Sequence, residues 1–320
     1  MKGISRKEFI RLSLLSSLSI PFAGLNSCKS PKEDKVEDVS TESPPRFIDN
    51  LGLQVFAVRD NLITDADSIF KELSEIGIKS IELFDPATLM NYVPIIRNYG
   101  MEAHCCHFLP GYISGKWETA QSIGMAPPEN YIFDNVLEDC NAAGIKYLGI
   151  AIMMPEERQT LEDYKHFADQ VNLAAEKSKA AGIQLYYHNH SFEFKPEGST
   201  TPMQEMLNVF DPDLVKIELD AFWVTISGND PIEWMDKLGN QLLFIHLKDL
   251  KKGTPLDYTV FEVAPDAFME LGTGSLDFHS ILTKARSLGV EYAFIDQDHS
   301  QVDMIESIRR NYEYVKSLGI

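Results

Sequence analysis

Basic residues are scarce in this sequence, and their scarcity limits what the protein can bind. The chain has 320 residues, with 29 Lys and Arg against 48 Asp and Glu, which gives a formal net charge of −19. A chain this acidic repels phosphate backbones, and no basic patch interleaved with aromatic residues occurs along it. We therefore expect no nucleic-acid partner. The composition, with 44% hydrophobic and 24% charged residues, is otherwise that of a globular protein.

Cysteine is also scarce, with four residues in the whole chain. Cys105 and Cys106 are adjacent within an expected strand, where neighbouring side chains point to opposite faces, so a bridge between them is disfavoured. Cys28 belongs to the N-terminal signal described next, which leaves an odd number. We expect Cys105, Cys106 and Cys140 to be buried free thiols rather than a disulfide framework.

The N-terminus lacks an apolar run long enough to span a membrane, but it has the pattern of an export signal. Residues 1–28 combine a basic start with an apolar run diluted by serine, and they end at Cys28. Residues 5–10, SRKEFI, resemble a twin-arginine signal in which Lys replaces the second Arg, and residues 25–28, LNSC, resemble a bacterial lipobox. We predict an exported lipoprotein, periplasmic or membrane-anchored, that meets the membrane only through a lipid on Cys28. A buried N-terminal helix is the alternative.

A charged stretch separates this signal from the folded body. Residues 29–46, KSPKEDKVEDVSTESPPR, contain almost no apolar side chains and are typical of a flexible tether. Removing residues 1–27 takes away four basic residues and one acid, so the remaining charge is 25 − 47 = −22. We predict one domain over residues 47–320.

The body alternates helical stretches with short apolar runs, and glycine marks the change from one to the other. Six helical stretches end in Gly and pass directly into such a run, which is typical of connections from a helix to a buried strand. The runs are β-branched or aromatic and do not alternate in polarity, as in parallel strands buried on both faces. Eight of them predict a single (βα)8 TIM barrel, an α/β fold. An open doubly wound sheet is the alternative, but no G-x-G-x-x-G follows the first strand. The glycines are Gly77, Gly100, Gly144, Gly182, Gly239 and Gly289, and the runs are 53–58, 79–84, 102–108, 146–152, 184–190, 215–220, 242–247 and 291–296.

Polar residues gather where the last four strands end, which in a TIM barrel is the face that forms the active site. These residues are His188, Asp220, His246 and Asp296. Imidazoles and carboxylates at consecutive strand ends are suited to bind a divalent cation. The alternative is that each is a satisfied core group or a helix cap. That alternative is preferred for two further acids, Asp249 and Asp298, which we expect to cap the segments that follow them.

Six motifs resemble those of the sugar phosphate isomerase/epimerase family, which belongs to the xylose isomerase-like TIM barrels. The resemblance covers the whole predicted domain, and its relatives include ketose 3-epimerases, inosose dehydratases, 3-keto-glycoside lyases and apurinic endonucleases. An apurinic endonuclease is disfavoured because a basic DNA face is missing. The motifs are GLQVFAVRD at 52–60, YHNH at 187–190, LDAFW at 219–223, IHLKD at 245–249, GTGSLD at 272–277 and IDQD at 295–298.

The resemblance implies a metal site built from strands five to eight, where the family usually has Glu, Asp, His and Glu. The matching positions here are His188, Asp220, His246 and Asp296, so two of the family's glutamates are replaced. Mn²⁺, Zn²⁺ and Mg²⁺ are all compatible, and two imidazoles favour the first two. Epimerases use two carboxylates to move a proton between faces of a carbon. Imidazole at position 188 removes that symmetry and favours β-elimination from a keto sugar, as in the dehydratase-like relatives.

Several neighbouring residues are candidates for catalysis or substrate binding. Lys248 is either an acid/base partner or half of a surface salt bridge, and His190 has the same strand phase as His188. Glu193 would supply a carboxylate if its loop folds back. Expected substrate contacts are Glu82, His107 and Trp223, the last as a sugar-stacking surface whose alternative is core packing.

These features predict a metal-dependent enzyme that acts on a keto sugar or glycoside through an enediolate, with isomerase or lyase chemistry. The alternative is a catalytically inactive, lipid-tethered sugar-binding barrel. An exported protein rarely meets sugar phosphates, and no cluster of Lys and Arg follows a strand, so we expect a non-phosphorylated carbohydrate. Nothing in the sequence specifies an oligomeric state.

Overall fold

The computed structural model of the chain describes residues 46–125 and 127–320. The predicted export signal, the lipobox cysteine and residues 29–45 of the predicted tether lie outside these residues. In the part of the chain that is described, no helix has both the length and the apolar character needed to cross a membrane.

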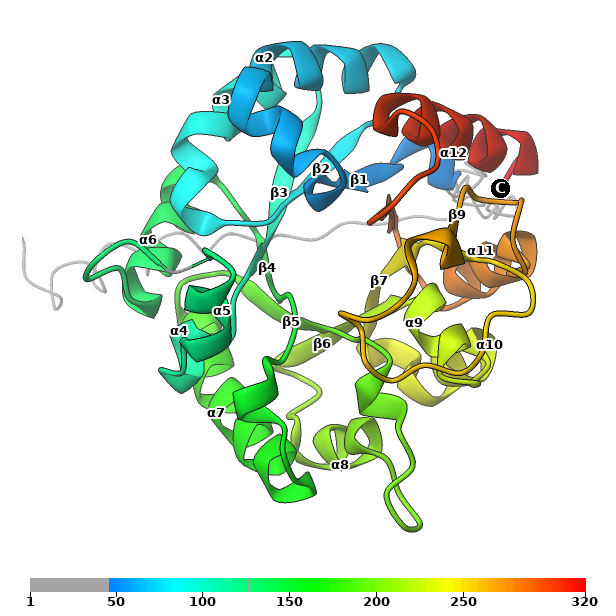
Figure 1. Cartoon of the computed structure of the whole chain (residues 1–320). Helices are drawn as coiled ribbons and strands as arrows, with labels where there is room; N and C mark the ends of the chain where they lie inside the picture. The colour runs from blue at the N-terminus through cyan, green and yellow to red at the C-terminus, as the bar shows by residue number, and fades with distance from the viewer. Residues whose placement is uncertain (1–45, 126) are drawn as a thin grey trace, which may run out of the picture. The chain divides into compact units, whose positions relative to one another are not determined.

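Eight parallel strands close into a barrel in the order β1-β10-β7-β6-β5-β4-β3-β2, which confirms the predicted fold (Figure 1). Helices surround the strands and pack their apolar faces against them. The barrel strands are β1 Gly52–Gln54, β2 Ser80–Leu83, β3 Glu102–Phe108, β4 Tyr147–Ile150, β5 Gln184–His188, β6 Val215–Asp220, β7 Leu242–Leu247 and β10 Tyr292–Ile295. The helices are α2 Arg59–Ile76, α3 Leu89–Asn98, α4 Gly111–Ser114, α5 Glu118–Ser122, α6 Phe133–Ala143, α7 Leu161–Ala180, α8 Pro202–Val209, α9 Ala221–Ile226, α10 Pro231–Leu238, α11 Phe278–Ser287 and α12 Met304–Leu318.

The six predicted glycines all have positive φ, between +52° and +117°, at the ends of helical segments. This left-handed backbone is accessible to glycine at little cost, so the helix ends there and the chain turns back into the barrel. The positions at which helices give way to strands were therefore readable from the sequence.

Five strands end earlier than the sequence suggests, and the ends of β1 and β5 bear on the site. β1 stops at Gln54 because the Gln54 side-chain oxygen accepts a hydrogen bond from the Phe56 N–H at 2.6 Å and starts the 3₁₀ helix Val55–Val58. β5 stops at His188, so His190 lies in the loop beyond the strand. Both changes move side chains toward the mouth of the barrel.

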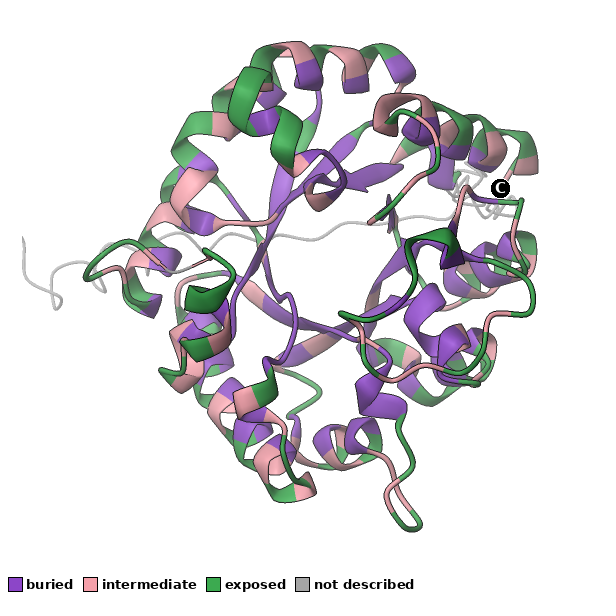
Figure 2. Cartoon of the chain, in the orientation of Figure 1, coloured by how far each residue is buried: buried purple, intermediate pink, exposed green. Residues whose placement is uncertain are grey.

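Aromatic side chains fill the barrel interior below the site, and the strands are buried almost throughout (Figure 2). Cys105, Tyr186, Phe244 and Phe294 form one buried cluster there. Gly149 makes this packing possible, since a side chain at that position would collide with the rings of Tyr186 and His107. The interior is thus closed beneath the site, as in other barrels of this kind.

The three cysteines among the described residues are free and buried, as predicted. Asp249 begins a short strand, β8 Asp249–Leu250, which pairs antiparallel with β9 Phe268–Met269. Its carboxylate accepts backbone N–H bonds of 2.9 Å from Gly272 and Gly274, so this acid is a loop cap, as expected. The G-x-G sequence therefore holds a carboxylate of the chain itself.

Candidate metal centre

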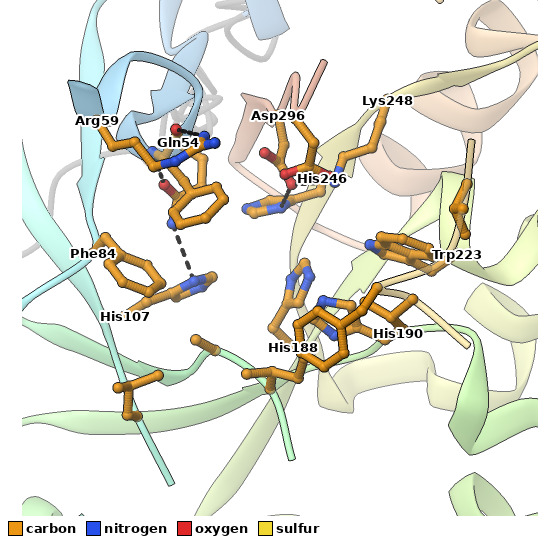
Figure 3. Close-up of a pocket in the computed structure, with 18 of the residues that line it drawn as sticks. Gln54, Arg59, Phe84, His107, His188, His190, Trp223, His246, Lys248 and Asp296 are labelled. Carbon is orange, nitrogen blue, oxygen red and sulfur yellow. Dashed lines mark hydrogen bonds and ion pairs between the residues drawn. The ribbon is translucent and has the colours of Figure 1, made fainter. Parts of the chain in front are cut away.

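The four predicted ligands lie together at the carboxyl ends of neighbouring strands. His188 ends β5, Asp220 ends β6, His246 is in β7 and Asp296 directly follows β10. Each offers a ligand atom within 4.8 Å of the others, and all four are buried. Figure 3 shows His188, His246 and Asp296 pointing into one cavity.

Strand register explains this convergence. Asp220 is paired with His246 across β6 and β7, so the two side chains point inward at the same level. Asp220 also caps α9, where its Oδ1 accepts N–H bonds from Phe222 at 2.8 Å and Trp223 at 3.1 Å. These bonds fix the carboxylate and leave Oδ2 on the side of His246 and Lys248.

Unpartnered oxygen atoms make the group suitable for a cation. Among the described residues, Asp220 Oδ2 and Asp296 Oδ1 are buried without a hydrogen-bond partner. Leaving a buried carboxylate oxygen unpaired costs free energy, which a bound cation would offset. Two imidazoles with two carboxylates form a donor set that suits Mn²⁺ or Zn²⁺.

Lys248 brings a positive charge into the same place. Its ammonium lies 2.6 Å from Asp296 Oδ2, 2.6 Å from Asp298 Oδ2 and 3.4 Å from Asp220 Oδ2. The side chain is 1% exposed, so the alternative of a surface salt bridge is wrong. Burial would lower its pKa, but the surrounding carboxylates raise it well above the usual range. Asp298, expected as a cap, instead accepts a hydrogen bond from this lysine.

The pKa values of the two ligand carboxylates are shifted in opposite directions. Burial raises the pKa of Asp220 to about 6 despite the nearby ammonium of Lys248. Burial opposes the charge on Asp296 as well, but Lys248 and His246 hold its pKa well below the usual range. Asp296 is therefore the fixed anion of the site.

A second layer of charged residues lies directly beneath these ligands. Glu218 Oε2 is 2.8 Å from His107 Nε2 and 3.0 Å from His188 Nδ1. Glu82 Oε2 is 2.8 Å from His246 Nε2, and another Glu82 oxygen contacts the Tyr186 hydroxyl. Sequence reasoning missed Glu218, although its position two residues before Asp220 predicts an inward side chain.

Acidic and basic side chains alternate in this second layer. Burial would raise the pKa of Glu82, but His107 and His246 hold it well below the usual range. Burial and Glu82 oppose ionisation of Glu218, yet His246 and His107 lower its pKa to about 2. Burial would lower the pKa of His107, and the two glutamates raise it to about 9. The Gln54 amide nitrogen, 3.1 Å from His107 Nδ1, opposes that rise because it favours an unprotonated Nδ1.

Only two of the three predicted substrate contacts line the cavity. His107 and Trp223 line the cavity, whereas Glu82 lies beneath the metal group and is enclosed by His107, His246 and Tyr186. The Trp223 ring lies 5.1 Å from the His190 ring, and its indole N–H has no partner among the described residues. Trp223 thus contacts both the core and the cavity.

The two other catalytic candidates also have different positions. His190 lines the cavity, and its Nδ1 has no hydrogen-bond partner in the described chain. Burial and the nearby Lys248 hold its pKa well below the usual value, so the ring is neutral. The Glu193 loop does fold back, but its carboxylate accepts bonds from the Tyr187 hydroxyl at 2.6 Å and the His190 N–H at 3.0 Å. It is not part of the cavity wall.

The cavity walls become apolar toward the mouth. Phe56 and Phe84 form a ring pair with centroids 5.1 Å apart, and the Arg59 guanidinium lies 4.0 Å above Phe56. Val260 and Phe261 cover the opposite side, from the long loop between β8 and β9. None of these five residues was identified from the sequence as part of the site. The cavity volume is about 270 Å³.

Two solved structures share this architecture. A sugar phosphate isomerase/epimerase from Parabacteroides distasonis superposes with a TM-score of 0.65 at 22% identity, covering 86% of this chain and 94% of that one. The IolI protein, crystallised with a bound zinc atom, superposes with a TM-score of 0.62 at 14% identity, covering 84% and 97%. At these identities the likeness shows the fold alone.

Sequence comparison extends the similarity to curated relatives. An inosose dehydratase from Clostridium perfringens is 26% identical over 164 residues, which is 48% of this chain and 54% of the relative. The chain thus matches about half the length of that relative. The sequence model of the xylose isomerase-like TIM barrels matches residues 70–316. This match covers most of the chain, and the chain therefore belongs to the xylose isomerase-like TIM barrel family.

Proposed function

We propose that this protein is a metal-dependent enzyme that removes a proton next to the carbonyl of a keto sugar and expels a substituent from the neighbouring carbon. The observation that carries the proposal is the floor of the cavity, where a four-residue ligand group and a buried ammonium meet. Family membership supports sugar isomerase, epimerase or dehydratase chemistry in general. The elimination is the finer proposal.

His188, Asp220, His246 and Asp296 would hold the cation, with Mn²⁺ or Zn²⁺ preferred over Mg²⁺. When bound, a divalent cation supplies a Lewis acid that polarises the carbonyl and stabilises an enediolate. The remaining steps are proton transfers by the chain itself. They need one unprotonated base and one proton donor on the cavity surface.

His190 and Lys248 have the properties that these two roles require. His190 is neutral and its Nδ1 is unpartnered among the described residues, so it can accept a proton from substrate. Lys248 keeps its proton at neutral pH and can donate it. Glu193 accepts a hydrogen bond from the His190 backbone N–H and so positions that residue. The sequence had instead suggested Glu193 as a carboxylate within the site.

For a 3-keto glycoside, the proposed elimination moves one proton to a base and one proton to the leaving group. The base takes the proton from the carbon between the carbonyl and the anomeric carbon. The released electron pair forms a carbon–carbon double bond as the bond from the anomeric carbon to the aglycone oxygen breaks. The departing oxygen then takes a proton from the donor, and no oxidant or reductant is consumed. His188, in place of the family's Glu, supports elimination over two-carboxylate epimerisation.

The walls of the cavity support a glycoside rather than a free sugar. A sugar ring suits the polar floor, whereas Phe56, Phe84 and Phe261 offer apolar surface to a second, less polar group. Among the described residues that line the cavity, Lys248 already faces three acids, and one N–H of Arg59 donates to the Phe56 carbonyl oxygen at 2.7 Å, so these residues form no cluster of cations for a phosphate. The proposed export through Cys28 is consistent with a non-phosphorylated substrate.

The test is incubation of manganese- or zinc-loaded protein in D₂O with an aryl 3-keto-glucoside, followed by NMR. We expect release of the phenol with an unsaturated sugar or its hydrate, and loss of both in a chelator-treated sample. Deuterium incorporation without phenol release would replace elimination with isomerase or epimerase chemistry. A 6-phosphorylated substrate processed in preference to its free counterpart would refute the proposed substrate class.

A catalytically inactive sugar-binding barrel is the second candidate, and one observation favours it. The Lys248 ammonium lies 2.6 Å from Asp296 and 2.6 Å from Asp298, so it offsets part of the negative charge that a metal ion would otherwise balance. This candidate predicts that keto glycosides bind to metal-free protein and dissociate unchanged. Calorimetric titration of chelator-treated protein, with NMR of the recovered ligand, distinguishes the two.

A further inference from the structure

The residues around the metal centre form two groups that are each able to hold a cation, and the groups share His188 and His246. The upper group adds Asp220 and Asp296, and the lower group adds His107 and Glu218. We propose that Glu218 is a positioning residue for the upper group, which presents Nε2 of His188 and Nδ1 of His246 as the ligating atoms. This inference rests on the metal site of the proposed function and assigns which nitrogen of each ring takes part.

The hydrogen bonds of His188 determine its orientation. Its Nδ1 lies 3.0 Å from Glu218 Oε2, and the side chain is almost fully buried. A carboxylate oxygen accepts hydrogen bonds from a ring N–H, so this contact places the proton on Nδ1 and leaves the lone pair on Nε2. Because the ring also lines the cavity, Nε2 is the nitrogen available there.

His246 is held in the opposite sense by acids below it. Its Nε2 lies 2.8 Å from Glu82 Oε2 and 3.1 Å from Glu218 Oε1. Its Nδ1 faces the upper carboxylates, at 3.3 Å from Asp296 Oδ2 and 3.9 Å from Asp220 Oδ2. With a proton held at Nε2 by two glutamates, Nδ1 is the nitrogen that would join Asp220 and Asp296 as a ligand, in place of its hydrogen bond to Asp296. Metal-bound histidines are commonly oriented by a carboxylate on their other nitrogen.

The lower group is less suited to hold the cation itself. Both nitrogens of His107 are engaged, with Nδ1 at 3.1 Å from the Gln54 amide and Nε2 at 2.8 Å from Glu218. Glu218 Oε2 already contacts two imidazoles. Among the described residues, one oxygen each of Asp220, Asp296 and Glu218 lacks a hydrogen-bond partner, but the Glu218 oxygen lies 3.1 Å from His246 Nε2, on the side of that ring away from Asp220 and Asp296. The lower acids therefore orient the rings, and the upper acids bind.

The experiment combines nitrogen NMR with zinc binding. Metal-free protein labelled with ¹⁵N-histidine reports which ring nitrogen carries the proton, and competition with a chromophoric chelator gives the zinc affinity. We expect His188 in the Nδ1–H form. In Glu218→Gln one carboxylate oxygen becomes an NH2 donor, so the amide cannot accept from all three imidazoles that Glu218 contacts. His188 or His246 should then become a mixture of forms, and zinc affinity should fall about 10- to 100-fold. Glu157→Gln, which changes a buried glutamate outside the site, should alter neither reading.

Three results would overturn the proposal. Circular dichroism confirms that each variant is folded before it is compared. An Nε2–H form of His188 in the unaltered protein, or unchanged zinc affinity in Glu218→Gln, would overturn the proposal. So would His107→Asn if it weakened zinc more than Asp296→Asn, because the lower group would then be the metal site. If the unaltered protein bound no zinc, the metal-dependent function would fail, while the NMR comparison would still test the positioning role.

Discussion

Replacing Lys248 by Met should destabilise the metal-free protein and increase its affinity for a divalent cation. The ammonium is fully buried and lies 2.6, 2.6 and 3.4 Å from the nearest oxygens of Asp296, Asp298 and Asp220. Removing one partner from a buried ion pair typically costs about 3–5 kcal/mol, because the charge left behind is uncompensated. Met preserves the apolar stem, so the free energy of unfolding in chelator should fall by about that amount.

A divalent cation would then supply the missing positive charge. At a metal concentration of about 100 times its Kd, binding to the native state alone adds about 2.7 kcal/mol, so zinc should recover much of the loss. Zinc should also bind more tightly to Lys248→Met than to the unaltered protein, because the competing ammonium is gone. Urea denaturation with and without zinc, together with chelator competition, measures both effects.

Lys251→Met is the matched control. Lys251 lies 2.7 Å from Asp266, but these side chains are 51% and 62% exposed, so its loss should cost less than about 1 kcal/mol. Equal stabilities of the two variants in chelator would refute the reasoning about the buried charge. Unchanged or weaker zinc binding in Lys248→Met would refute the competition between ammonium and metal.

Three further outcomes follow from the site. His246→Ala or Asp220→Ala should lose most bound cation, by elemental analysis, while circular dichroism stays that of a folded barrel, because strand-end residues serve the site more than the core. His188→Glu should raise solvent deuterium exchange relative to elimination, measured by NMR, since it restores a second carboxylate. Burial raises the pKa of Glu193 to about 7. The native state therefore binds this proton more tightly than the unfolded chain. The resulting stability is present below pH ~4.5, and up to about 3 kcal/mol is lost as pH rises through 7. Glu193→Gln should remove that part of the pH dependence of urea unfolding.

Each of these has a contrary result. Full metal content in His246→Ala would place the cation elsewhere. Exchange that stays unchanged in His188→Glu would mean that position 188 does not select the reaction. An identical pH dependence of stability in Glu193→Gln and the unaltered protein would show that the Glu193 carboxyl titrates normally in the fold.

The gathering of the four ligand residues at one face was predictable because two local rules apply. Glycine after each helix locates the start of the next strand, and the carboxyl ends of barrel strands meet at one face. Those rules were enough to predict from the sequence that His188, Asp220, His246 and Asp296 lie together. They also gave the exact bounds of β6 and β7.

The second layer was not predictable in the same way. Glu82 contacts His246 across a separation of 164 residues, and Glu218 contacts His107 across 111. Such contacts depend on the height of each residue in the closed barrel, which register shifts in β2 and β6 alter. Inward phase alone would have nominated Glu218, but only the closed sheet shows which rings it faces.

The apolar mouth was missed for another reason. Val260 and Phe261 come from a long connection whose path the sequence pattern does not define, and Phe56 belongs to a 3₁₀ turn that was expected to be strand. Loops at this face vary most among barrels and carry substrate specificity. Their contribution to the cavity therefore required the three-dimensional structure.

A cation held by the upper group is central to the proposed chemistry, and anomalous diffraction from crystals grown with zinc or manganese tests for it most directly. We expect one strong anomalous peak enclosed by His188, Asp220, His246 and Asp296, with Nε2 of His188 and Nδ1 of His246 facing it. A peak between His107 and Glu218, or none at millimolar metal, would contradict it.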